Sequence, residues 1–140
     1  MESSTNESLF EKAMSRYQSG TNAEDLLQDF ESITSALPNQ AAGWTCLAWL
    51  QLLCDQPDLA LNSARIAVKL DGRDPQARIN LSLALLETKG KGVRDHIDCV
   101  KKILAFVPEC AKELTTSIED GLERKPDWQA LKKIKDWLEL

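Results

Sequence analysis

The sequence repeats itself with a period of 34 residues, and this period constrains the fold more than any other feature. Phe10, Trp44 and Arg78 follow one another at intervals of 34 residues. The same interval separates the members of six further sets: Ala13, Leu47 and Leu81; Met14, Ala48 and Ser82; Leu26 and Ala60; Phe30 and Ala64; Ile33 and Ala67; and Pro38 and Gly72. A unit of this length cannot bury its own apolar side chains, so such a chain folds as a stack of units that pack on their neighbours.

The third unit is two residues longer than the first two. An interval of 36 residues leads from apolar positions of the second unit to His96, Val100, Ile103 and Pro108, whereas an interval of 34 leads to polar residues. We place the two extra residues in the turn around Lys89 to Gly92, because insertions in repeats belong in loops. The units are therefore expected at 7–40, 41–74 and 75–110, after a flexible polar N-terminus at 1–6.

The spacing of apolar residues predicts helices throughout the chain. Leu26, Phe30 and Ile33 recur at the three- and four-residue intervals that place side chains on one face of a helix. Asp74 followed by Pro75 is typical of a helix start, and few residues of the chain, 6 Gly and 5 Pro, break helices. We expect eight helices at about 7–19, 23–36, 41–54, 57–70, 75–89, 93–106, 109–122 and 127–139.

This repeat pattern resembles the tetratricopeptide repeat (TPR) family over residues 7 to 110. The second unit matches best, with large and small residues in the family's positions: Trp44, Leu47, Ala48, Ala60 and Ala67. It departs from the family at three positions: Gln51, Ala64 and Gly72. The resemblance implies an all-α fold, a right-handed superhelical stack of antiparallel helix hairpins.

The last 30 residues, 111–140, leave the 34-residue pattern but keep a helical one. Trp128, Leu131, Ile134 and Leu138 lie on one face of the last predicted helix, and lysines lie on the other. The open end of a helical stack needs a cap with a polar outer side. We therefore expect residues 111–140 to form capping helices. The alternative is that the last helix binds a partner or a membrane surface, since its polar face carries Lys132, Lys133 and Lys135 and the helix has two Trp.

The resemblance also implies a concave groove lined by the first helix of each unit, where a partner protein or peptide would bind. The positions that would face it include Glu11, Ser15, Thr45, Trp49, Leu52, Gln76, Ile79, Leu83 and Leu86. Its middle is apolar, which suits a segment with apolar anchors. The alternative, left open here, is that these residues pack against the protein's own last helix or against a second copy in a homodimer.

One TPR subclass binds the acidic C-terminal tail of the Hsp70 and Hsp90 chaperones through a clamp of Lys, Asn and Arg. The corresponding positions here hold other residues: Glu11, Ser15, Cys46, Gln76 and Asn80. Without cations, a groove does not attract a carboxylate terminus. We therefore expect that such tails are not partners.

Composition and motifs argue against several other functions. The net charge of −5 disfavours nucleic acid as a partner, and no apolar run is long enough for a membrane span. No secretory signal is recognisable at the start, so we expect a cytoplasmic protein. The four cysteines include no C-x-x-C pair and His96 is the single histidine, so we expect no metal, no cofactor and no catalytic residues.

The sequence thus leads to two hypotheses about function. The first is a non-enzymatic protein-interaction module, an adaptor or scaffold that binds a partner in the groove. The second is a dedicated chaperone or assembly factor that holds an apolar segment of a client protein. An enzyme would have only His96 and its neighbouring carboxylates to work with.

Overall fold

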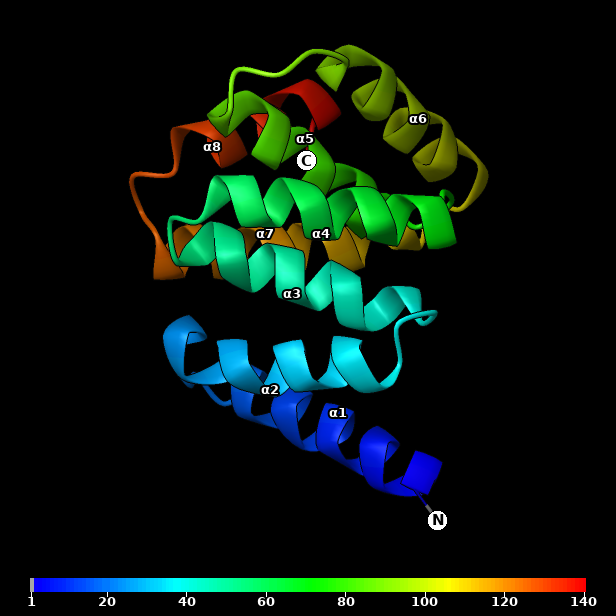
Figure 1. Ribbon diagram of the computed structural model, residues 1–140. Coiled ribbons are helices and arrows are strands. Elements are labelled where there is room, and N and C mark those ends of the chain that lie inside the picture. The colour runs from blue at the N-terminus through cyan, green and yellow to red at the C-terminus, as the bar shows by residue number, and fades with distance from the viewer. Residues whose placement is uncertain (1) are drawn as a thin grey trace.

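The computed structural model describes the backbone of residues 2–140 and the side chains from residue 9 onward. Residues 2–140 form eight helices joined by short turns (Figure 1). The helices are α1 (Glu2–Gln18), α2 (Ala23–Ala36), α3 (Ala41–Leu53), α4 (Pro57–Leu70), α5 (Pro75–Glu87), α6 (Val93–Phe106), α7 (Cys110–Arg124) and α8 (Gln129–Leu138). The expected all-α fold with eight helices is confirmed.

Local sequence signals set most helix ends. Pro57 and Pro75 occupy the first turns of α4 and α5, where a missing N–H costs nothing. The Asp74 carboxylate accepts a hydrogen bond from the Gln76 N–H at 3.0 Å and caps α5. The Gly92 backbone is left-handed, with φ of 99°, and allows the chain to turn into α6 at the place where the insertion was predicted.

The first helix differs from its prediction at the start. It begins at Glu2 and not near residue 7, so residues 2–6 are helical and not the loose segment expected at 1–6. The segment from Glu2 to Asn6 contains no glycine or proline that would stop a helix. A helix that begins at residue 7 can therefore extend backwards through it.

The first six helices stack in chain order, each packed on the next. Completely buried alanines, Ala60, Ala64 and Ala67, line one face of α4 and let it approach α3 and α5 closely. A first core joins α1, α2 and α3 around Leu26, Phe30 and Ile33. The repeat therefore fulfils the physical role expected of it, with each hairpin burying the apolar face of its neighbour.

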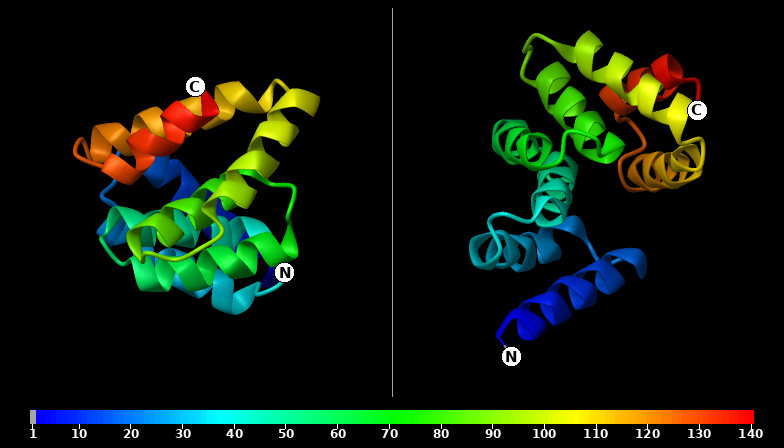
Figure 2. Two further views of the ribbon diagram at one scale, coloured as in Figure 1. Left: turned by 90° about the horizontal axis from the view of Figure 1, so that it is seen from above. Right: turned by 90° about the vertical axis from the view of Figure 1, so that its right-hand side faces the viewer.

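The C-terminal hairpin of α7 and α8 folds back beside the stack. Both helices pack on α5 and α6 (Figure 2, right) and do not continue the line from α1 to α5. A second core joins α3 and α5 to this hairpin, around Leu52 and Ile79 on one side and Ile118, Leu131 and Ile134 on the other. The expected capping helices thus cover a side of the stack as well as its end.

Asn80 links two repeats through a completely buried amide. Its nitrogen donates to the Thr45 carbonyl in α3 at 2.9 Å, and its oxygen accepts from the Gln76 side chain at 2.8 Å. We expect Asn80→Leu to lower the free energy of unfolding by about 1–3 kcal/mol, because Gln76 loses a buried partner. Urea unfolding measures this, with Lys112→Leu at an exposed position as control. Equal midpoints for both variants would contradict the prediction.

Candidate functional site

The middle of the predicted groove is part of the protein's own core. Leu52, Ile79 and Leu83 are each 0% exposed and belong to one core with the side chains of α7 and α8. The prediction that these three residues line an open groove is therefore wrong. The alternative stated above, packing against the last helices, is what the structure shows. The TPR resemblance implies which helix face is concave, but it does not say where the C-terminal hairpin crosses that face.

The other predicted groove residues fall into two groups. Glu11 and Ser15 are exposed on α1, and Leu86 is a half-buried neighbour of the second core. Thr45, Trp49 and Gln76 border a pocket of about 150 Å³. These three residues of the prediction are therefore brought together at one site, although each is largely buried.

This pocket lies among α1, α2, α3, α5 and α7, and most of its walls are apolar. Its lining consists of Met14, Tyr17, Phe30, Thr45, Cys46, Trp49, Leu50, Gln76 and Ser117. Sequence reasoning missed Met14, Tyr17, Phe30 and Leu50 as lining residues, because it assigned large residues of the repeat to the core. Ser117 comes from the hairpin that leaves the repeat pattern, so no periodic signal pointed to it.

Cys46 adds an uncharged thiol to the pocket. Burial, helped by the nearby Asp74 carboxylate, raises the pKa of the Cys46 thiol to about 12. Its Sγ donates to the Met14 Sδ over 3.6 Å. The two sulfur atoms therefore form a soft, polarisable wall, of the kind that adapts to apolar side chains of different shape.

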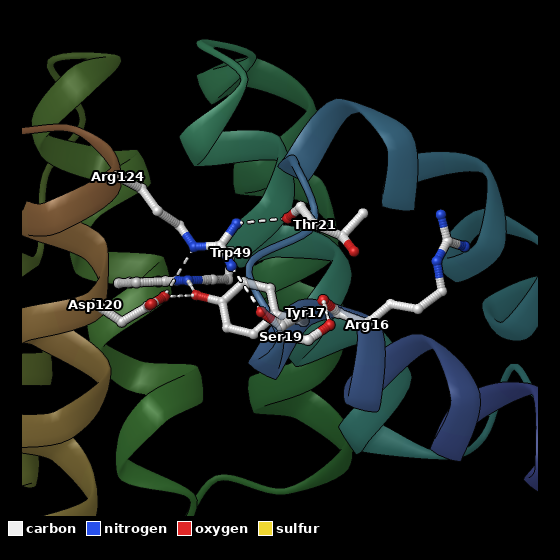
Figure 3. Close-up of polar contacts among 7 residues, drawn as sticks. All are labelled: Arg16, Tyr17, Ser19, Thr21, Trp49, Asp120 and Arg124. Atoms are coloured by element: carbon white, nitrogen blue, oxygen red, sulfur yellow. Dashed lines mark hydrogen bonds and ion pairs between the residues drawn. The ribbon is translucent and has the colours of Figure 1, made fainter.

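A polar network spans the site beside the pocket (Figure 3). The Trp49 indole N–H donates to the Tyr17 hydroxyl at 2.8 Å, and that hydroxyl donates to the Asp120 carboxylate. Burial and the Asp120 carboxylate raise the pKa of Tyr17 above its usual value, so the phenol keeps its proton. The network thereby joins residues of α1, α3 and α7.

Arg124 completes the network. Its guanidinium donates to the Asp120 carboxylate at 3.1 Å, to the Thr21 carbonyl at 2.9 Å and to the Tyr17 carbonyl at 2.7 Å (Figure 3). It also lies over the Tyr17 ring, 4.0 Å from the centroid. Three of the five N–H donors of this cation are thus used by Asp120 and by carbonyls at the end of α1 and in the turn after it.

A larger and more polar cavity of about 620 Å³ lies past the network. Its lining consists of Gln18, Ser19, Gly20, Asn22, Ala23, Glu24, Leu53, Cys54, Asp120, Glu123 and Arg124. On each of α1, α3 and α7 these residues follow, in sequence, those that line the apolar pocket. The two hollows therefore succeed one another along the same face, with Tyr17, Asp120 and Arg124 between them.

Residues 9–140 contain no group of three or more His, Cys, Asp or Glu side chains placed to hold a metal ion. His96 Nδ1 lies 2.9 Å from Arg78 Nη1. Burial and the Arg78 charge lower the pKa of His96 below its usual value. Its described partner is thus a cation and not a nucleophile.

Solved structures provide the comparison with known proteins, since no protein-family model and no curated protein matches the chain. The type III secretion chaperone SycD of Yersinia enterocolitica, in complex with a peptide of the translocator YopD, is 25% identical, with a TM-score of 0.69 over 94% of this chain and 95% of that chain. SycD in an alternative dimer is 24% identical, with a TM-score of 0.67 over 95% and 96%. The first TPR of Spaghetti (RPAP3), bound to an HSP90 peptide, is 17% identical, with a TM-score of 0.55 over 96% and 94%.

These similarities cover almost the whole of each chain. The chain is a TPR-like helical repeat protein. The resemblance read from Trp44, Leu47 and Ala48 is confirmed, and so is the stack of helices in chain order. None of the helices described in residues 2–140 is long and apolar enough to cross a membrane.

Proposed function

We propose that this TPR-like protein is a non-enzymatic chaperone that binds an apolar segment of a client protein in the pocket bordered by Met14, Cys46 and Trp49. The apolar lining of that pocket is the observation that carries the proposal. The structural similarity to SycD, which was solved with a translocator peptide, supports it. Of the two hypotheses from the sequence, this favours the chaperone over the adaptor. A secretion translocator is the first class of client to test.

The size of the pocket suggests what it accepts. An apolar cavity of about 150 Å³ holds a molecule such as benzene, so the pocket suits one apolar side chain. A single anchor of this kind contributes most when it is fully desolvated at the centre of an interface. We therefore propose that the client segment places one Leu, Ile, Met or Phe side chain between Met14 and Ser117 and extends from there along the concave face.

The electrostatics of the site favour this type of client over an acidic tail. Arg124, the cation of the network, donates all its described hydrogen bonds to Asp120 and to backbone carbonyls. Asp120, Glu123 and Glu24 add negative charge beside it. The exclusion of Hsp70 and Hsp90 tails thus stays a prediction with a structural reason. A cytoplasmic location and self-association, the latter suggested by the SycD dimer, stay predictions as well.

Photo-crosslinking identifies the client and tests the site. Benzoylphenylalanine in place of Met14 should capture a client protein in cells, and the same group in place of the exposed Arg65 should not. Mass spectrometry of the crosslink gives the client segment, which is then made as a synthetic peptide. Equal capture at both positions would contradict the proposal.

Filling the pocket then tests whether the peptide binds there. Ser117→Trp places a large side chain in the pocket, and we expect it to weaken binding of the synthetic peptide by about tenfold or more, an effect of at least about 1.4 kcal/mol. Thr116→Trp, at the adjacent exposed position, is the matched control and should bind like the unmodified protein. Titration calorimetry measures both. Unchanged affinity in Ser117→Trp, with helicity intact, would place the binding site elsewhere.

A further inference from the structure

α1 and α7 lie on opposite sides of the concave face, and side-chain hydrogen bonds connect them more than helix packing does. α1 packs on α2, whereas α7 packs on α5, α6 and α8. Between α1 and α7 the described hydrogen bonds are those of Tyr17, Asp120 and Arg124, together with the Thr21 carbonyl in the turn after α1. We call these three side chains the clasp. Figure 3 shows them meeting, with Trp49 of α3 beside them.

The chemistry of the clasp follows from the end of α1. A helix leaves its last four carbonyls without partners in the helix and carries partial negative charge there. α1 ends at Gln18, so the Tyr17 carbonyl is one of these groups, and Arg124 binds it at 2.7 Å. The guanidinium also stacks on the Tyr17 ring while Asp120 holds the Tyr17 hydroxyl. The hydroxyl and the backbone carbonyl of Tyr17 are thus both bound by residues of one turn of α7.

Asp120 and Arg124 belong to neither core, so their bonds to α1 can open while Tyr17 keeps its packing against both. The first core, of α1, α2 and α3, is centred on Leu26 and Phe30, and the second, which joins α3 and α5 to the C-terminal hairpin, on Ile79 and Ile134. The clasp lies between them and is partly accessible to water, with 17% of the Arg124 side chain and 35% of the Asp120 side chain exposed. Water that reaches these partly exposed side chains screens their charges and so weakens the ion pair. Opening therefore exchanges a few solvent-accessible polar contacts for contacts with water.

The clasp stands between the apolar pocket and the polar cavity that follows it. Tyr17 lines the first, and Asp120 and Arg124 line the second. We infer that the clasp is a latch that keeps the two hollows apart in the unliganded chain, and that a client segment long enough to run through both must open it. This inference rests on the function proposed above, and it adds that the latch opposes the binding of long segments.

Thiol modification tests the latch without any client. Cys46 lies in the wall of the apolar pocket, against Met14, and Cys99 lies in α6 away from the clasp. We expect Asp120→Asn and Tyr17→Phe to raise the rate at which iodoacetamide modifies Cys46 by about tenfold, with the rate at Cys99 unchanged. Glu119→Gln, on the exposed side of α7, is the control and should leave both rates unchanged. Peptide mass spectrometry measures the two rates in one sample. No change at Cys46, or equal rises at Cys46 and Cys99, would overturn the latch.

Peptide length tests what the latch does to binding. Two synthetic peptides from the segment crosslinked at Met14 serve as probes, one of about 6 residues, spanning about 20 Å, and one of about 15. Asp120→Asn should raise the association rate and the affinity of the long peptide several-fold and leave those of the short peptide unchanged. Equal effects on both peptides, or weaker binding of the long one, would overturn the inference. If neither peptide binds the unmodified protein, the proposed function fails, and the thiol rates still decide whether the clasp opens.

Discussion

Gly121→Leu is expected to lower the free energy of unfolding by about 3 kcal/mol, the upper part of the range for an overpacked core. Gly121 lies in α7 where this helix crosses Trp49. A Cβ atom there would lie 2.7 Å from Trp49 Cζ2 and 2.9 Å from Leu131 Cδ2, both closer than atoms in contact approach. Leucine favours helix over glycine by somewhat under 1 kcal/mol, which offsets only part of this cost.

Glu119→Leu provides the matched control for Gly121→Leu. It introduces the same side chain two residues earlier in α7, at an exposed position. Urea unfolding followed by circular dichroism gives the free energy of each variant, and Glu119→Leu should stay within about 0.5 kcal/mol of the unmodified protein. A Gly121→Leu variant as stable as this control would mean that α7 does not pack on Trp49.

Ile134→Ala should have an effect of similar size, a loss of about 2–5 kcal/mol. Ile134 is completely buried in α8, within the core that holds the C-terminal hairpin against α3 and α5. The substitution leaves a cavity between α8 and the stack. It should also loosen the contact of Trp49 with Trp128, whose ring centroids are 5.2 Å apart. Urea unfolding measures the loss of stability, and tryptophan fluorescence reports on the ring contact.

Lys133→Ala separates a cavity effect from a general effect on α8. Lys133 is the neighbouring residue and is exposed, so its substitution keeps the core intact. We expect its unfolding midpoint and fluorescence to match those of the unmodified protein. If Ile134→Ala proved no less stable than Lys133→Ala, the hairpin would not be anchored through Ile134.

The parts of the fold that the sequence predicts well are those with local causes. The predicted helices at 23–36, 57–70 and 93–106 agree with α2, α4 and α6 at both ends. Proline at a first turn and glycine at a turn act within a few residues, so they can be read directly from the sequence. The early start of α1 was not predicted, because the residues from Glu2 to Asn6 carry no local signal that marks where a helix begins.

The candidate site was predicted less completely because it depends on contacts between distant segments. Thr45, Trp49 and Gln76, which the TPR resemblance placed in the groove, line the apolar pocket, and their contact with a partner stays a prediction. The burial of Leu52 and Ile79 was left as an alternative, because it depends on the path of α7 and α8. Tyr17 and Asp120 are 103 residues apart in the sequence, and no local pattern relates them.

The position of α3 has a consequence for the synthesis of this chain. One side of α3 packs on α1 and α2, which precede it in the chain. Trp49 and Leu52, by contrast, pack on side chains of α7 and α8, which are made later. During translation the N-terminal hairpin can therefore dock as soon as α3 emerges from the ribosome. α4 and α5 then cover a further side of α3, but the part of Trp49 and Leu52 that contacts α7 and α8 stays uncovered while about 60 following residues are made. The nascent chain thus presents an apolar surface for several seconds, at the usual rate of about 5–20 residues per second.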